Sequence, residues 1–148
     1  MSNRRLAAIS AGAVLAAGLI AAGLPTSAQA QPERAAVGCY AGSCYKQDPT
    51  EMGCGADAVT GAQVWTSTSS LVELRWSNAC QAAWARIRYA RPGDLIEVNG
   101  PGDTHQAWTV QQGYTEGWTN MVSDRSYVET ATACGWRTVL GMACTIAY

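Results

Sequence analysis

The side chains that could do chemistry in this chain are one histidine, eleven acidic residues and six cysteines. A serine-hydrolase triad needs a nucleophile, a base and an orienting group. His105 is the only imidazole base, and Asp103 lies two residues before it in the segment GDTHQAW. The chain has no G-x-S-x-G motif, however, and NGPGD predicts that His105 lies in a turn. We therefore interpret His105 as a solvated loop residue and predict no catalytic residue.

The acidic residues form no pattern that would support catalysis or metal binding. Glycoside hydrolysis uses two carboxylates that flank the scissile bond, whereas the acids of this chain are scattered and lie in no recognisable motif. A calcium loop needs several oxygen donors at alternating positions, and the segments DPTE and NGPGDT offer too few. We predict no metal and no cofactor. The acids considered for a carboxylate pair are Asp57, Glu73, Asp94, Glu97, Asp103 and Asp124.

The six cysteines predict three disulfides, because an even number of cysteines in an exported chain is typical of a disulfide framework. Their spacing favours a pair between Cys134 and Cys144, with the other four cysteines paired among themselves in an order that the sequence leaves open. Zinc is disfavoured, since no C-x-x-C pair exists and an oxidising compartment favours disulfides over thiolate ligands. The predicted disulfide cysteines are Cys39, Cys44, Cys54, Cys80, Cys134 and Cys144.

Exposed aromatic side chains are the best candidates for a binding site. The chain has six tryptophans and six tyrosines but no phenylalanine, so we expect about half of the tryptophans to build the core. An exposed tryptophan can stack on the face of a sugar or anchor a protein interface. The turn predicted in GYTEGWTNMV would expose Tyr114 and Trp118 together. These two residues, with Arg75 and Trp84 of the hairpin described below, are the candidate ligand-binding residues.

Residues 1–30 have the features of a signal peptide. A short positive end, MSNRR, precedes an apolar run from Leu6 to Leu24, and Pro25 ends that run. The segment SAQA then places small residues at an A-x-A cleavage site, so we expect cleavage after Ala30. The alternative is an uncleaved membrane anchor, because the run is nearly long enough to span a bilayer. We predict a protein secreted to the extracellular space, with no membrane segment after cleavage.

Residues 31–38 are predicted to form a flexible mature N-terminus, and residues 39–148 a single disulfide-rich β domain. The segment CYAGSCYKQDPTEMGCG predicts a disulfide-tied loop, with a turn at Asp48-Pro49 and one short helical turn over residues 50–52. Short β-branched or aromatic segments follow, separated by turns such as RPGD. They predict a mainly β fold with little helix, either a small antiparallel sandwich or a partly open barrel. Outside the hairpin, the predicted strand segments are AQVWTSTS, LIEVNG, HQAWTVQQG, EGWTNMV, SYVETAT and GWRTVLGM.

The segment VELRWSNACQAAWAR predicts a β-hairpin with a connection over residues 78–81. Alternation gives the first strand one face with Val72, Leu74 and Trp76 and another with Glu73, Arg75 and Ser77. The predicted pairs are Ser77–Ala82, Trp76–Ala83, Arg75–Trp84, Leu74–Ala85, Glu73–Arg86 and Val72–Ile87. In this register apolar residues meet apolar residues, and a slip by one residue would lose the agreement. A helix over QAAWARIR is the alternative, since Ala and Arg favour helices.

We interpret the polar face of this hairpin as solvent-exposed scaffold. In the predicted register Trp76 points inward, whereas Trp84 points outward with Arg75 against its ring. An exposed cross-strand pair contributes about 0.2–1 kcal/mol, so Trp84→Ala is predicted to cost little stability if Trp84 is exposed. Cys80, which would tie the end of the hairpin to the N-terminal loop, should contribute more, about 2–4 kcal/mol.

The segments CYAGSCYKQDPTEMGC, DAVT and VELRWSNACQAAWAR, followed by Met121-Val122, resemble the family called domain of unknown function 2690. Its members are similar in having C-x4-C, a following D-P, a G-C, and an E-L-R-[YW]-S…C…A-W block. The resemblance covers roughly Cys39 to Val122. It implies a secreted protein of actinobacteria or related Gram-positive bacteria, and it supplies no function. Cys134 and Cys144 lie beyond the matching blocks.

The favoured hypothesis is a secreted, monomeric, non-catalytic domain that binds cell-wall glycan or an extracellular protein through Trp and Tyr at loop edges. One alternative is a small secreted hydrolase or toxin enzyme that uses scattered carboxylates or His105. Another is a proteinase inhibitor that presents the loop from Cys39 to Cys54. The formal net charge is −1, and the absence of a basic patch argues against a nucleic-acid partner. Converging titratable groups in a pocket would favour the enzyme, and a protruding rigid loop the inhibitor.

Overall fold

The computed structural model describes residues 36–125, 130–137 and 141–148. These residues form nine β-strands and two short 3-10 helices, η1 (Ala41–Cys44) and η2 (Cys54–Ala56), and they contain no α-helix. The predicted mainly β fold is therefore confirmed. The strands are β1 (Val59–Trp65), β2 (Leu71–Ser77), β3 (Ala82–Arg88), β4 (Leu95–Asn99), β5 (His105–Thr109), β6 (Gly117–Trp118), β7 (Val122–Ser123), β8 (Thr132–Trp136) and β9 (Ala143–Cys144).

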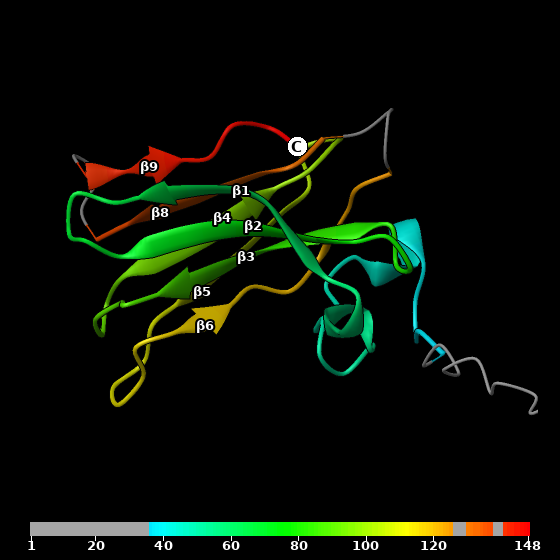
Figure 1. Ribbon diagram of the computed structural model, residues 1–148, viewed down its shortest axis with the longest axis horizontal. Coiled ribbons are helices and arrows are strands. Elements are labelled where there is room, and N and C mark those ends of the chain that lie inside the picture. Colours follow the sequence, from blue (N-terminus) through cyan, green and yellow to red (C-terminus); the bar gives the residue numbers. More distant parts are fainter. Residues whose placement is uncertain (1–35, 126–129, 138–140) are drawn as a thin grey trace, which may run out of the picture. The chain divides into compact units, whose positions relative to one another are not determined.

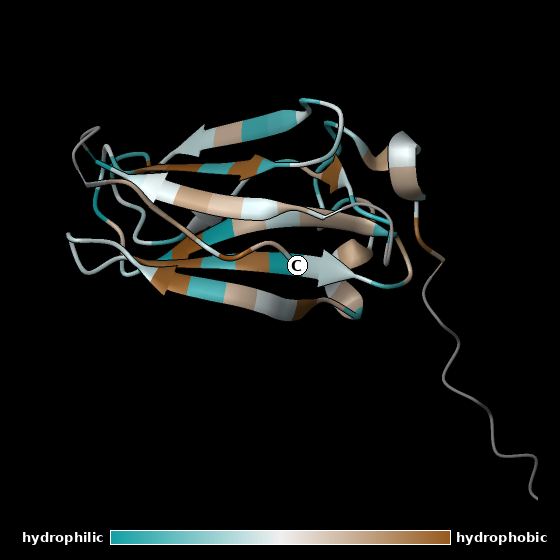
Figure 2. Ribbon diagram, turned by 90° about the horizontal axis from the view of Figure 1, so that it is seen from above, coloured by the Kyte–Doolittle hydropathy of each residue, from teal (hydrophilic) through white to brown (hydrophobic). Residues whose placement is uncertain are grey.

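The strands form two antiparallel sheets that pack face to face and do not close into a barrel (Figure 1). One sheet has the order β1-β2-β3-β6, with β7 also paired to β3, and the other has the order β5-β4-β8-β9. Figure 2 shows these two layers from the side, with apolar residues along the strands of both. Of the two predicted architectures, the sandwich is the one that forms.

The core lies between the two sheets and is built from short apolar side chains. It takes Val72, Leu74 and Ile87 from the hairpin and Ile96 and Val98 from β4, and each of these five side chains is fully buried. Alternation along each strand puts these residues on one face, as the sequence predicts. The half-buried Trp76 packs against this cluster, and its indole N–H donates to the carbonyl of Asp124 at 3.1 Å. The predicted inward face of the hairpin is confirmed.

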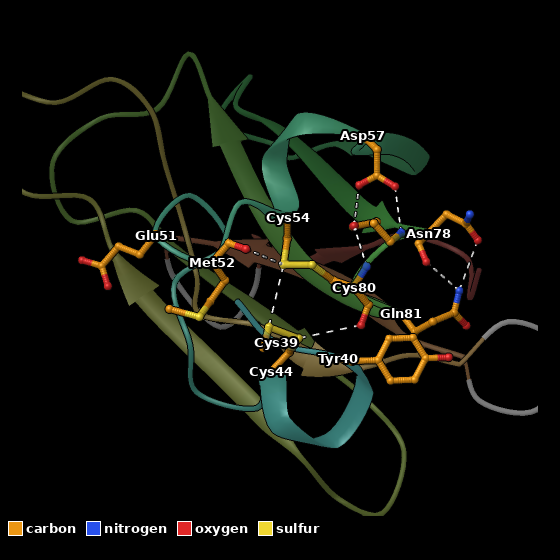
Figure 3. Close-up of a disulfide and its surroundings, with 12 residues drawn as sticks. Cys39, Tyr40, Cys44, Glu51, Met52, Cys54, Asp57, Asn78, Cys80 and Gln81 are labelled. Atoms are coloured by element: carbon orange, nitrogen blue, oxygen red, sulfur yellow. Dashed lines mark hydrogen bonds between the residues drawn. A yellow bond between two sulfur atoms is a disulfide. The ribbon is translucent and has the colours of Figure 1, made fainter. Parts of the chain in front are cut away.

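The predicted hairpin register is also confirmed in all six pairs, from Ser77–Ala82 to Val72–Ile87. The segment QAAWARIR therefore forms a strand rather than a helix, because its residues complete this register. The predicted four-residue connection is held by Asp57, whose carboxylate accepts the Ser77 hydroxyl at 2.5 Å and the Ala79 N–H at 2.8 Å (Figure 3). Elsewhere some strand bounds differ by three or four residues from the prediction, and the segment EGWTNMV forms two short strands, β6 and β7, rather than one. For example, β1 begins at Val59, three residues before the predicted start.

The solvent-exposed outer face predicted for the hairpin is wrong. Trp84 does lie on the face opposite the core, but it is only 5% exposed, and Glu73 is only 3% exposed. The N-terminal loop covers the part of this face at Trp84, which packs with four cysteines and Met121 in a second buried cluster. Alternation predicts which side a residue takes, but not whether a distant segment covers that side. The inference from register to exposure therefore fails, and the small stability cost expected of Trp84→Ala loses its premise.

The disulfides divide as predicted, with Cys134 bonded to Cys144 and the other four cysteines paired among themselves. Cys39 bonds to Cys44 within the N-terminal loop, and Cys54 bonds to Cys80 at the end of the hairpin. The predicted tie between Cys80 and the N-terminal loop is thus confirmed. Figure 3 shows the two N-terminal disulfides side by side, and the Sγ atoms of Cys39 and Cys54 lie 3.8 Å apart.

Backbone hydrogen bonds fasten the same loop to the first sheet. The N–H of Ala41 donates to the carbonyl of Cys80 at 2.7 Å, and the N–H of Lys46 donates to that of Met121 at 3.0 Å. In the other direction, the N–H of Met121 donates to the carbonyl of Gln47 at 2.9 Å. The loop that a proteinase inhibitor would present is therefore packed against the sheet. The predicted turn after Asp48 is present over residues 49–53, and a 3-10 helix follows at Cys54.

Several predictions lie outside the described residues. They include the signal peptide of residues 1–30, most of the flexible segment 31–38, and parts of the strands predicted in SYVETAT and GWRTVLGM. Within the described ranges, no helix has the length and apolar character needed to cross a membrane.

Candidate functional site

Two hollows adjoin at Trp118, on the side of the sandwich where β5 and β6 form sheet edges. The larger has a volume of about 500 Å³ and the smaller about 170 Å³. Glu116 and Trp118 line both of them. The larger hollow is also lined by Asp48, Gln106, Ala107, Trp108, Gln111, Tyr114, Gly117 and Asn120. The smaller one is also lined by Pro49, Thr50, Gly55, Arg75, Trp84 and Arg86.

A close contact between the two sheets lies in the lining of the larger hollow. A methyl group added to Gly117 in β6 would come within 2.3 Å of the Trp108 ring in β5. Only a residue without a side chain therefore lets the indole lie against the β6 backbone, and the half-buried Trp108 also packs on the core. Because Gly117 directly precedes Trp118, the same contact fixes the position of the backbone that carries the Trp118 side chain.

The Trp118 ring is held in place by the disulfide-tied loop. Its indole N–H donates to Oδ2 of Asp48 at 3.0 Å. The other oxygen of Asp48 accepts the N–H groups of Thr50 and Glu51 at 2.7 and 3.1 Å, which fixes the carboxylate. Trp118 remains 39% exposed. The indole is therefore fixed at its nitrogen edge while part of its ring stays accessible from the hollows.

Three amide side chains give the larger hollow an excess of hydrogen-bond acceptors. The amide nitrogen of Gln111 donates to the carbonyl of Thr109 at 2.7 Å, and that of Asn120 donates to the carbonyl of Lys46 at 2.9 Å. The amide nitrogen of Gln106 likewise donates to a backbone carbonyl, that of His105. Within the described part of the chain, no protein donor contacts the three amide oxygens. Since each amide oxygen can accept hydrogen bonds, the lining is suited to a ligand that donates them.

The smaller hollow lies over the outer face of the hairpin and contains two guanidinium groups. Arg86 donates from Nε to Oε2 of Glu73 at 2.6 Å, and Arg88 donates to Oε1 at 3.2 Å. Arg75 instead donates to the Thr60 hydroxyl at 2.5 Å and to the carbonyl of Ala58 at 2.8 Å. The sequence predicts that Arg75 contacts the ring of Trp84. The two residues are paired in the register and line the same hollow, but the hydrogen bonds of the Arg75 guanidinium go to Thr60 and Ala58.

The outer face of the hairpin has more positive than negative charges around Glu73, and these charges shift the pKa values of Glu73 and Arg75. Burial alone would raise the pKa of Glu73, but the hydrogen bond from Arg86 and the charges of the neighbouring arginines hold it below its usual value. Burial and the charge of Arg86 lower the pKa of Arg75. Three guanidinium groups thus surround the one carboxylate of Glu73, so the local charge of this group of residues is positive.

The four candidate residues from the sequence lie around the two adjoining hollows. Tyr114 and Trp118 line the larger one and are both exposed, whereas Arg75 and Trp84 line the smaller one. Sequence reasoning missed most of the remaining lining, including Trp108. Alternation in HQAWT could have placed Gln106 and Trp108 on one face of a strand. No sequence signal joined that face to Asp48, because the contact is made through tertiary structure.

About half of the tryptophans contribute to the core, as expected, since Trp84 lies in one buried cluster and Trp76 and Trp108 pack on the other. Trp84 is buried, Trp65 and Trp118 are exposed, and the other three are half-buried.

The other chemistry-bearing residues lie elsewhere. His105 is the exposed first residue of β5 rather than a turn residue, since its backbone pairs with Asn99. Asp94 is buried, with its carboxylate accepting hydrogen bonds from Ser70, the Arg91 N–H and Arg137 at 2.7–2.9 Å. Burial would raise the pKa of Asp94, but these donors lower it. Asp94 therefore has a structural role.

Four cysteine sulfurs lie within 4.8 Å of one another, a spacing that could hold a metal ion if they were thiolates. All four are disulfide-bonded, and zinc binds the deprotonated thiolate. In this state the cluster is structural. It forms the buried packing surface for Trp84.

Comparison with known proteins gives one match. A family model described as protein of unknown function (DUF2690) matches residues 42–134, which is more than half of the chain. No curated protein and no solved structure matches. The matched region includes every residue that lines the two hollows, from Asp48 to Asn120.

Proposed function

The chain belongs to this DUF2690 family, whose description assigns no function, and we propose that it binds a glycan in the larger hollow beside Trp118. The observation that carries the proposal is the fixed indole. Asp48 holds Trp118 by its nitrogen edge in the wall of a hollow of about 500 Å³. A volume of this size lies within the usual range for small-ligand sites. The ring would stack on the apolar face of a sugar.

The polar lining supports a hydroxyl-rich ligand. A pyranose offers one apolar face and a rim of hydroxyl groups, and amphipathic aromatic residues suit such mixed surfaces. The oxygens of Gln106, Gln111 and Asn120, with the carboxylate of Glu116, would accept hydrogen bonds from that rim. Tyr114, which is 60% exposed at the mouth of the hollow, would add a second aromatic contact.

Binding is a better account of this hollow than hydrolysis. A glycosidase needs two carboxylates free to act on the bond and on a water or sugar carbon. Asp48 and Glu116 are the carboxylates of the lining, and three N–H donors already occupy Asp48. Asp48 is therefore a positioning group for Trp118. The predicted export of the chain makes bacterial cell-wall glycan the ligand to test first.

A sedimentation assay tests this proposal. Protein expressed from the full chain and purified is mixed with isolated Gram-positive cell walls, and the walls are pelleted. We expect saturable sedimentation that soluble wall-derived oligosaccharides compete away. Trp118→Ala should abolish sedimentation because it removes the stacking surface.

Trp65→Ala is the matched control, since Trp65 is another exposed tryptophan, 56% accessible, at the end of β1 and stacked on Tyr89. This variant should sediment as the unmodified protein does. Protein that stays in the supernatant would refute wall-glycan binding. Loss of sedimentation in Trp65→Ala but not in Trp118→Ala would place the binding surface at the other tryptophan.

A further inference from the structure

The smaller hollow has donors where the larger one has acceptors. Arg75 and Arg86 come from neighbouring strands and lie on the same face, since Arg75 pairs with Trp84, two residues before Arg86. Both guanidinium groups line the hollow, and neither is a buried side chain. Two forks of N–H donors thus reach one small space that is bounded by the rings of Trp84 and Trp118.

Both arginines keep donors that the protein does not use. Arg86 donates from Nε to Glu73, and within the described ranges no protein acceptor contacts its two terminal nitrogens. Arg75 has no carboxylate within ion-pair distance among those residues, and its protein acceptors are a hydroxyl and a carbonyl. A guanidinium group carries five N–H donors in a planar fork that suits carboxylate and phosphate oxygens.

The positive charge of this face is not cancelled locally. Glu73, the buried carboxylate, is shared between Arg86 and Arg88. Glu116 is the carboxylate in the lining of the smaller hollow, which it shares with the two guanidinium groups of Arg75 and Arg86. Glu116 also lines the larger hollow and is exposed, so it stands at the junction between the two.

The two hollows share Trp118, which makes them neighbouring parts of one surface. We propose that the smaller hollow binds an anionic substituent, a carboxylate or a phosphate, carried by the glycan whose sugar ring lies on Trp118. This inference rests on the proposed function and narrows it to acidic glycans. The substituent lies between Arg75 and Arg86 while the hydroxyl groups of the sugar face the amide oxygens of the larger hollow.

Calorimetric titration of the purified protein with matched sugars tests the proposal without altering the protein. The first pair is the disaccharide of N-acetylglucosamine and N-acetylmuramic acid and the methyl ester of its lactyl carboxyl group. The ester removes the charge and adds one methyl group. Charge-assisted hydrogen bonds are about twice as strong as neutral ones, so we expect the acid to bind roughly tenfold more tightly, and the preference should shrink at high salt.

The second pair separates the two sources of the anion. N-acetylglucosamine 6-phosphate is compared with N-acetylglucosamine. A preference for the phosphate alone assigns the hollow to phosphate-bearing glycans, and a preference for the muramyl acid alone assigns it to carboxylate-bearing ones. Either result supports an anion site.

Arg75→Gln should bring the ratio of acid to ester affinity close to one, whereas Arg75→Lys should keep part of it, because the charge remains but the planar fork is lost. Equal affinity for acid and ester in the unmodified protein, together with equal affinity for the phosphorylated and plain sugars, would overturn the anion site and leave the glycan proposal standing. Failure of all four sugars to bind would overturn both.

Discussion

The two faces of the β2–β3 hairpin are covered to different degrees and by different means. The inner face carries Val72, Leu74 and Ile87, which pack on the second sheet with no exposed surface. The outer face carries Glu73 and Trp84, which are 3% and 5% exposed. The disulfide-tied loop covers Trp84, whereas Glu73 is paired with Arg86 and Arg88, which stay half-buried.

The difference between the faces shows how a small domain can bury a charged side chain. An apolar core needs only shape and area, whereas buried charges must be paired and hydrogen-bonded. The outer face meets this need with Glu73 and two arginines, and the loop that covers it also supplies Asp48 to the Trp118 ring. We conclude that the cover of the outer face and the wall of the proposed site are one structural unit.

The largest expected effect is that of removing Trp84. Truncating a buried tryptophan to alanine costs about 3–5 kcal/mol, so Trp84→Ala should lower the free energy of unfolding by that amount in urea titrations. Leu74→Ala, on the inner face, should cost about 2–5 kcal/mol. A loss below about 1 kcal/mol for Trp84→Ala, against a large loss for Leu74→Ala, would mean that the outer face is open.

The next effect is that of the disulfides. Replacing Cys54 and Cys80 together by serine should cost about 2–4 kcal/mol, because that bond closes a loop with a sequence separation of 26 and holds the cover in place. The same change at Cys134 and Cys144, with a separation of 10, should cost roughly 0.8 kcal/mol less on loop length alone. Thermal unfolding of both double variants measures which disulfide contributes more stability. A larger loss for the Cys134–Cys144 variant would contradict the role of the Cys54–Cys80 bond in holding the covering loop.

A smaller effect is expected from Glu73→Gln, which keeps the shape of the side chain but removes its charge. Hydrogen bonds to charged groups contribute about 1.5–3 kcal/mol, so the free energy of unfolding at pH 7 should fall within that range. An unchanged value would mean that the arginines on this face do not depend on Glu73.

The pH dependence of stability sharpens the same comparison. The pKa values of Glu73 and Asp94 are lowered in the folded protein from ordinary values of 4.5 and 3.8. A lowered pKa means that the stabilisation is complete above the unfolded value and is lost as pH falls through the folded value. Stability should therefore fall below about pH 4, and less steeply in Glu73→Gln. An identical acid profile in that variant would contradict the assignment.

Local sequence rules were sufficient for the hairpin but not for its surroundings. Alternation and pair matching predicted every pair from Ser77–Ala82 to Val72–Ile87, because register depends on neighbours within one hairpin. They did not predict that Trp84 is covered, since the cover comes from cysteines up to 45 residues earlier in the chain.

The candidate site was only partly predictable for the same reason. Tyr114 and Trp118 could be named from one exposed turn, whereas Asp48 bonds to Trp118 across a separation of 70 residues. Trp108 joins them through a contact with Gly117 between the two sheets. No local pattern encodes such contacts, which depend on how the sheets pack.

The most direct test of the link between cover and site is the affinity of Asp48→Ala for the glycan ligand found in the wall assay. Removing this carboxylate breaks the hydrogen bond to the Trp118 ring and those to the N–H groups of Thr50 and Glu51 in the following turn. The expected stability cost is about 1 kcal/mol. We predict that affinity falls at least tenfold while the protein remains folded at room temperature, and that Asp48→Asn, which keeps an oxygen acceptor, recovers part of it. Unchanged affinity in a folded Asp48→Ala protein would contradict the account, because the covering loop would then have no part in the site.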